Sequence, residues 1–161
     1  MRFRRLKKEE LEALEEDFVQ FLASNHITAK EWTALKASEN EKVYELLDVF
    51  SDIVFEKIYS KVDYLQHRTK DTVRVFHCQE DKIVMTGLRI SDATRDLTQP
   101  EDIAILADAS QLQGPVKIFQ IEKAYSKERA EEIFLMIEKD RCQPAPRSMF
   151  DALIAMYQSS N

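Results

Sequence analysis

Glycine is nearly absent from this sequence, with only 2 among 161 residues, Gly87 and Gly114. The glycine-rich phosphate loops of P-loop proteins and of dinucleotide-binding proteins need several glycines, because the backbone must approach the phosphates closely. The sequence therefore excludes these two nucleotide-binding motifs. It says nothing about nucleotide sites that are built in other ways.

Cysteine and long apolar runs are also scarce. The 2 cysteines, Cys78 and Cys142, are too few for a disulfide framework, which is typical of a reduced, cytoplasmic protein. No apolar run approaches the roughly 18 residues that span a bilayer, and no apolar segment of the signal-peptide kind follows the basic N-terminus. We therefore expect a cytoplasmic protein with no membrane partner.

The net charge of −6 is distributed unevenly along the chain. The cations of the first eight residues are Arg2, Arg4, Arg5, Lys7 and Lys8. From Glu9 to Glu56, in contrast, acidic side chains far outnumber lysines. An acidic protein body discourages non-specific nucleic-acid binding, whereas the basic tip is suited to a phosphate or an acidic partner.

The longest segment with one clear period runs from residue 38 to residue 62. Its apolar residues recur at steps of three and four: Val43, Leu46, Leu47, Phe50, Ile53, Val54, Ile58 and Val62. This spacing predicts a long amphipathic helix with Phe50 in the core. Ser38 and Glu41 have the spacing of a capping box at its start. On the opposite side, Glu45, Asp48, Asp52 and Glu56 are expected to form a solvated face.

The other segments predict an α+β fold. Helices are expected at 7–24 and 28–35, forming an N-terminal helical hairpin with 38–62, and again at 100–109, 126–141 and 148–158. Strands are expected at 62–68, 72–78, 82–90 and 116–121, which gives an antiparallel sheet of about four strands followed by C-terminal helices. We expect a single domain over residues 1–142, and a proline hinge with a terminal amphipathic helix over residues 143–161.

Strand alternation predicts two apolar faces for the 72–90 hairpin. One face would carry Val73, Val75, Val84, Leu88 and Ile90, and we expect it to cover the 38–62 helix. The other would carry Phe76, Cys78, Ile83 and Met85, and it is too apolar to remain in water. Its cover would be the 127–141 helix, the 149–158 helix or a partner.

The best candidates for metal ligands are His67, His77 and Cys78. His77 and Cys78 are adjacent in a strand, so their side chains point to opposite faces and at most one of them can join His67. Neither a CxxC nor an HxxxH spacing is present, and no GxSxG motif occurs. We therefore assign no metal site, no cofactor and no catalytic residue.

Two parts of the chain carry a family resemblance: MRFRRLKKEELEALEEDFVQFLASNHITAKEW, and ELLDVFSDIVFEKIYSKVDYLQH after it. They resemble a small family of uncharacterised cytoplasmic proteins of the Bacteroidota. That family is classified as a domain of unknown function. The likeness is looser over residues 96–98 and 124–129. It implies a soluble bacterial protein, and it brings no catalytic or binding residues with it.

These observations favour a non-enzymatic protein–protein interaction module, acting as an adaptor or regulator, with another protein or a second copy as partner. The expected binding residues are Arg2, Arg4, Arg5, Phe76, Ile83, Met85, Phe150 and Tyr157. One alternative is a nucleic-acid- or ribosome-associated factor that uses the basic N-terminus. Another is an enzyme without a recognisable motif.

Overall fold

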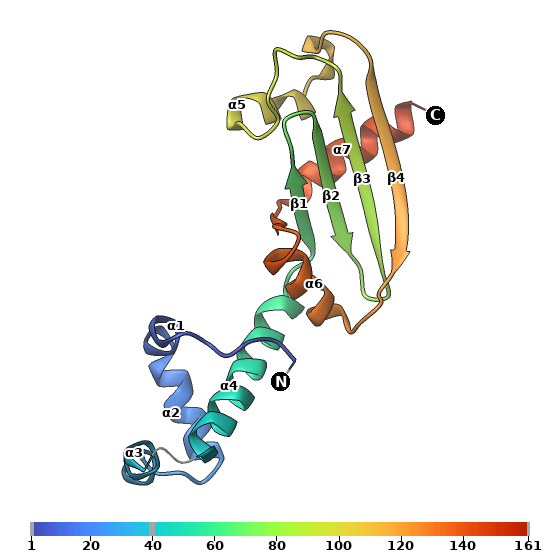
Figure 1. The fold of residues 1–161 in the computed structure, drawn as a ribbon. Helices are drawn as coiled ribbons and strands as arrows, with labels where there is room; N and C mark the ends of the chain where they lie inside the picture. Colours follow the sequence, from blue (N-terminus) through green and yellow to red (C-terminus); the bar gives the residue numbers. More distant parts are fainter. Residues whose placement is uncertain (1, 39–40, 161) are drawn as a thin grey trace. The chain divides into compact units, whose positions relative to one another are not determined.

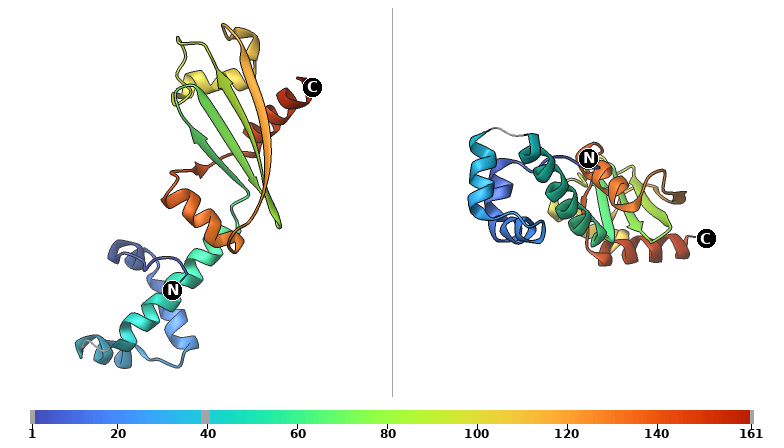
Figure 2. Two further views of the ribbon diagram at one scale, coloured as in Figure 1. Left: turned by 45° about the vertical axis from the view of Figure 1, so that its right-hand side comes forward. Right: turned by 90° about the horizontal axis from the view of Figure 1, so that it is seen from below.

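The chain forms two compact units, Met1–Ser60 and Lys61–Asn161 (Figures 1 and 2). The computed structural model describes residues 2–38 and 41–160. Helices make up the first unit, and an antiparallel sheet with helices makes up the second. The structure thus confirms the α+β class. The division at residue 143 into a domain and a hinged helix stays a prediction.

The described part of the first unit contains α1 (Lys8–Ala13), α2 (Glu15–Ser24), α3 (Ala29–Ala37) and α4 (Glu41–Ser60). The single helix predicted over 7–24 is divided at Leu14, whose φ of −110° and ψ of 24° are not helical. The start of α3 is as the sequence indicates, because the Thr28 side chain accepts a hydrogen bond from the Glu31 backbone N–H at 3.1 Å.

The capping box predicted for the long helix is wrong at Ser38. This residue ends α3, and its hydroxyl donates to the Leu35 carbonyl at 3.0 Å. The helix α4 begins at Glu41, and residues 39 and 40 lie outside the described residues. Ser38 serves the preceding helix because its own backbone is still helical.

Aromatic side chains form the core of the first unit, with Phe50 at its centre as predicted. Phe50 is 3% exposed, and its ring centroid lies 5.0 Å from that of Phe18 and 5.3 Å from that of Phe21. Phe55 and Tyr59 stack with centroids 5.8 Å apart, and both rings contact Phe3 from the N-terminal segment. The first residues of the chain are therefore part of this core.

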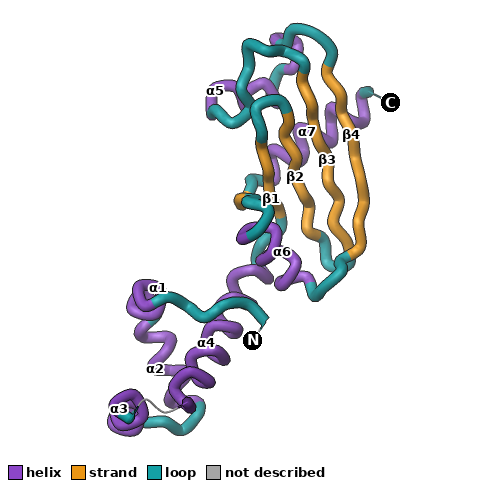
Figure 3. The backbone as a smooth tube through the Cα atoms, in the orientation of Figure 1, coloured by secondary structure: helices purple, strands orange, loops and turns teal. Residues whose placement is uncertain are grey.

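The second unit contains a five-stranded antiparallel sheet of order β4-β3-β2-β1-β5 (Figure 3). Its strands are β1 (Tyr64–Arg68), β2 (Thr72–Cys78), β3 (Lys82–Ile90), β4 (Val116–Ala124) and β5 (Gln143–Pro144). The bounds of β2 and β3 are those that the sequence predicts. The sequence did not indicate β5, because a strand of two residues, one of them a proline, carries no strand pattern.

The helices of the second unit are α5 (Pro100–Ile103), α6 (Arg129–Glu138) and α7 (Arg147–Ser159), with two 3-10 turns, Ala104–Leu106 and Ala109–Gln111. The helix predicted over 100–109 is thus one short α-helix followed by the 3-10 turns. The α6 helix is shorter than its predicted segment, and α7 is slightly longer than its own at both ends.

The α7 helix covers the sheet face for which we expected the 38–62 helix. The cluster of buried residues on this face is Val73, Val75, Val84, Leu88, Ile90, Leu97, Ile105, Phe150 and Leu153. In Figure 1, α7 crosses behind the strands. The expectation was wrong because β5 pairs with β1 and the Ala145 N–H donates to the Tyr64 carbonyl at 3.0 Å, which leads the chain directly into α7 beneath the sheet.

The other face is covered by α6 at one end only. Cys78 and Ile83 lie at this end and are 1% and 2% exposed. Arg129, the first residue of α6, donates to the Cys78 carbonyl at 2.8 Å and to the Gln79 carbonyl at 3.1 Å. These bonds hold α6 against the ends of the strands. Figure 1 shows no other described helix of the second unit over the remainder of this face.

Candidate functional site

We call the sheet surface opposite α7, apart from Cys78 and Ile83, which α6 covers, the open face. Strand alternation and the pairing register give its residues in β2, β3 and β4: Thr72, Arg74, Phe76, Met85, Gly87, Arg89, Lys117, Phe119, Ile121 and Lys123. These residues come from segments far apart in the sequence. Antiparallel pairing places the directly paired residues of β2, β3 and β4 in rows that run across the sheet.

The middle row of the open face is apolar. Phe76 pairs with Met85, and Met85 pairs with Ile121. Phe76 and Met85 are half-buried, whereas Ile121 is 56% exposed. Of the binding residues that the sequence predicts, Phe76 and Met85 thus lie on this surface with part of each side chain in solvent.

The next row contains Arg74, Gly87 and Phe119. A Cβ on Gly87 would lie 2.3 Å from Cζ of Phe119, so the outer end of the phenylalanine ring fills the space above the glycine. The guanidinium carbon of Arg74 lies 5.9 Å from the ring centroid, within cation–π range. Gly87 thereby lets an aromatic ring lie over the strand, beside a cation.

Cations border the apolar residues at both ends. Arg89 and Lys117 pair in one outer row, and both are exposed. At the other end, Lys123 is close to Glu132 of α6, with Nζ and Oε1 3.1 Å apart. Among the open-face positions of β2, β3 and β4, all of which the structure describes, none is acidic. The open face therefore combines an apolar centre with a positive border.

Three other residues of the predicted binding set lie elsewhere. Ile83 is 2% exposed at the end that α6 covers. Phe150 is 8% exposed, and its ring packs against Tyr64 and His77 with centroids 5.5 Å and 5.2 Å away. Tyr157 is half-buried on α7. Ile83 and Phe150 are core residues in this conformation.

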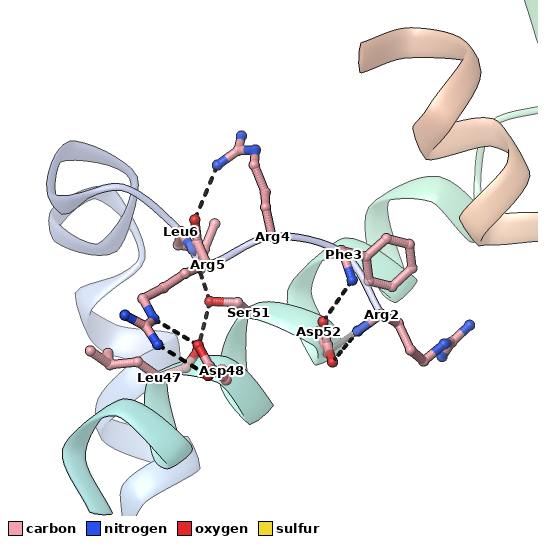
Figure 4. Close-up of polar contacts among 9 residues, drawn as sticks. All are labelled: Arg2, Phe3, Arg4, Arg5, Leu6, Leu47, Asp48, Ser51 and Asp52. Atoms are coloured by element: carbon pink, nitrogen blue, oxygen red, sulfur yellow. Dashed lines mark hydrogen bonds and ion pairs between the residues drawn. The ribbon is translucent and has the colours of Figure 1, made fainter. Parts of the chain in front are cut away.

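The three arginines of the predicted N-terminal binding tip each pair with a carboxylate of their own unit. Nε of Arg5 lies 2.6 Å from Oδ1 of Asp48 (Figure 4). Arg2 pairs with Glu56 at 2.9 Å, and Arg4 pairs with Glu10 at 2.8 Å. The Arg5 contact also holds the pKa of Asp48 below its ordinary value. A nucleic acid bound at this tip would compete with these pairs.

The acidic stripe of α4 is therefore more than a solvated face, which corrects our expectation. Asp52 accepts hydrogen bonds from the backbone N–H groups of Arg2 and Phe3 at 2.9 and 3.1 Å (Figure 4). The Leu6 N–H donates to the Ser51 hydroxyl at 2.9 Å. The stripe anchors the N-terminal segment because the two carry opposite charge and lie side by side.

The candidate metal ligands do not converge. His67 lies on the β1 strand at the open-face side, whereas His77 points to the α7 side and stacks on Tyr64 with centroids 4.5 Å apart. Cys78 is buried, and that burial raises the pKa of its thiol to about 12. Within residues 2–38 and 41–160, no group of three or more His, Cys, Asp or Glu side chains is placed to hold a metal ion.

The first unit carries a separate apolar groove of about 760 Å³. Its lining includes Phe18, Leu22, Ile27 and Trp32, and charges of both signs, Lys8, Glu15 and Lys36 among them. A groove with this mixed border favours no particular sign of charge in a ligand. The open face is more selective, because its border has one sign only.

The sequence indicated half of the open face and missed the other half. The alternation of Lys117, Phe119, Ile121 and Lys123 along β4 was a readable signal of one strand face. That Arg74 and Arg89 lie beside these residues follows only from the pairing of three strands.

Fold and site together define an α+β protein whose sheet has one partly apolar face with a border of cations. The chain belongs to a family of unknown function, DUF6495, whose family model matches residues 1–158. No curated protein and no solved structure matched the chain. Among the described helices, none is long and apolar enough to cross a membrane.

Proposed function

We propose that this protein is a non-enzymatic protein–protein interaction module of the bacterial cytoplasm, an adaptor or regulator, and that the open face is its binding surface. One observation carries the proposal: Phe76, Met85, Phe119 and Ile121 form a partly exposed apolar centre within a border of cations. Protein interfaces combine an apolar core with a polar rim in this way.

The open face fits an acidic protein better than a nucleic acid. The whole chain has a net charge of −6, which repels a polyanion at long range. One of the four cations of the open face, Lys123, is already close to Glu132. Both phenylalanine rings are half-buried, which leaves little flat surface on which bases could stack.

Site-specific photocrosslinking in the source cells tests this function. A benzophenone amino acid placed at Ile121 faces the open side, and the same group at Glu122 points to the other side of the same strand. We expect the Ile121 position to crosslink to a defined protein that the Glu122 position does not reach. Equal crosslinking from both positions, or none from either, would overturn the proposal.

A further inference from the structure

We propose that β4 binds an extended segment of the partner as a sixth strand, and that this segment carries the pattern acidic, apolar, apolar, acidic at alternate residues. The inference rests on the proposed function, because it specifies how the open face holds its partner. It follows from the position of β4 in the sheet and from the side chains on one side of it.

The nine-residue strand β4 is an edge strand. Its neighbour within the sheet is β3, and in the described chain no strand lies along its outer side. The outer backbone groups of an edge strand are a template for an added strand, whose main-chain hydrogen bonds supply affinity. A strand added here would extend the open face beyond β4.

The side chains of β4 specify the pattern of that strand. Lys117, Phe119, Ile121 and Lys123 point to the open side at alternate positions. Directly opposite residues of paired strands interact, and opposite charges or two apolar groups are favourable there. Acidic residues are thus expected opposite the two lysines, and apolar residues opposite Phe119 and Ile121. This order reads the same in both strand directions.

Lysines on an edge strand can also serve only to prevent pairing. Protection of that kind would not place an isoleucine that is 56% exposed directly between them. Nor is a second copy of this chain the occupant that the charges favour. Antiparallel pairing of two β4 strands centred on Gln120 would set Lys117 of each copy opposite Lys123 of the other, and like charges in that position are destabilising.

The test uses the full chain and a labelled peptide, Asp-Thr-Ile-Thr-Ile-Thr-Asp, followed by fluorescence anisotropy. We expect binding that Lys117→Glu and Ile121→Asp each weaken at least tenfold. Lys139→Glu, which makes the same charge change at an exposed residue at the end of α6, should leave the affinity unchanged. Equal weakening by all three substitutions would overturn the inference.

Two N-methylated peptides test strand pairing itself. In one, alternate amides that would face β4 are methylated; in the other, the amides that would face solvent are methylated. Strand addition predicts that only the first loses binding. Equal affinity of the two peptides would overturn strand addition.

The outcomes separate this inference from the proposed function. Failure of every peptide to bind, with the crosslink at Ile121 still present, would overturn the strand and leave the interaction module. Tighter, salt-dependent binding of a twelve-nucleotide oligouridine that Lys117→Glu abolishes would overturn both, because the open face would then be a nucleic-acid surface.

Discussion

At the scale of single residues, Gly87 shapes the open face more than its size would suggest. It leaves a space above β3 that the Phe119 ring fills, and it separates Arg74 from Phe119 within one row. Aromatic rings that cover a strand glycine in this way also support the sheet. The same contact therefore serves the fold and sets the position of an apolar group on the open face.

Gly87→Ala is predicted to move the Phe119 ring without unfolding the sheet. The added methyl group meets only the outer atoms of a side chain that can rotate away, and alanine restricts the unfolded chain. We expect the free energy of unfolding to change by no more than about 1 kcal/mol. The ring resonances of Phe119 should shift clearly in NMR spectra; unchanged resonances would show that the ring does not lie over residue 87.

Phe50→Ala is predicted to destabilise the first unit by about 3–5 kcal/mol, because it leaves a cavity among packed rings. The single tryptophan, Trp32, has its ring centroid 5.1 Å from that of Phe18, so its fluorescence in urea reports on this core. Val49→Ala, at a neighbouring residue that is 52% exposed, is the control and should change stability by less than about 0.5 kcal/mol. Similar losses in the two variants would place Phe50 outside the core.

The pair of Arg4 and Glu10 predicts a pH dependence of the first unit. Hydrogen bonds from the Arg4 side chain, with one from the Lys7 backbone, lower the pKa of Glu10 from 4.5 to about 2. The folded state therefore favours the ionised form of Glu10. The contribution of this carboxylate to the free energy of unfolding is complete above pH 4.5 and is lost as the pH falls toward 2.

The urea midpoint, followed by Trp32 fluorescence, measures this contribution. The urea midpoint of wild type should be higher than that of Glu10→Gln at neutral pH, and this difference in midpoint should disappear near pH 2. Glu16→Gln, an exposed residue on α2, serves as the charge-matched control. A difference between wild type and Glu10→Gln that is constant with pH would contradict a role for the carboxylate charge.

At the scale of elements, α7 decides whether the sheet has a core. Leu153 is fully buried, and Phe150 lies beside it in the same cluster with Val73 and Leu88. The helix is joined to the sheet by β5, which pairs with β1. Backbone hydrogen bonds thus join the segment before α7 to the sheet.

Leu153→Ala is predicted to destabilise the second unit by about 2–5 kcal/mol. Hydrogen exchange of the β2 and β3 amides measures this, and Gln158→Ala, at an exposed residue of the same helix, should have little effect.

A chain that ends at Cys142 should expose the apolar face and associate in light scattering. If that shortened chain stays monomeric and keeps its protected amides, α7 does not complete the core.

At the scale of the whole molecule, each compact unit has its own core, and charge is used differently in the two. In the first, the N-terminal arginines are paired with the acidic side of α4. In the second, four cations lie on one side of the sheet, where the described strands carry no acid. The distribution of charge along the sequence, taken alone, would have placed a positive surface at the N-terminus.

The chain is predicted to keep its melting temperature in excess chelator, because the candidate ligands are divided between two sheet faces. His77 packs between aromatic rings, and the raised pKa of Cys78 keeps that thiol protonated. Differential scanning fluorimetry with and without chelator measures this. Stoichiometric zinc in native mass spectra that His67→Ala removes would contradict it.

The sequence by itself determined what depends on neighbours along the chain. The periods of three to four and of two residues identified the helical segments without all of their breaks, the strands β2 and β3, and the two faces of their hairpin, because side-chain direction in a regular element follows from backbone geometry. They also identified Phe50 as a core residue and Phe76 and Met85 as a face without an assigned cover.

Only the tertiary structure decided which element covers which face. Periodicity says that a face is apolar but carries no information on its partner, so the choice of α7 over the 38–62 helix depended on the short pairing of β5 with β1. The register across β2, β3 and β4 likewise brought Arg74, Gly87 and Phe119 into one row. Such contacts join residues distant in sequence, and their free energy depends on the packing of the whole unit rather than on any local pattern.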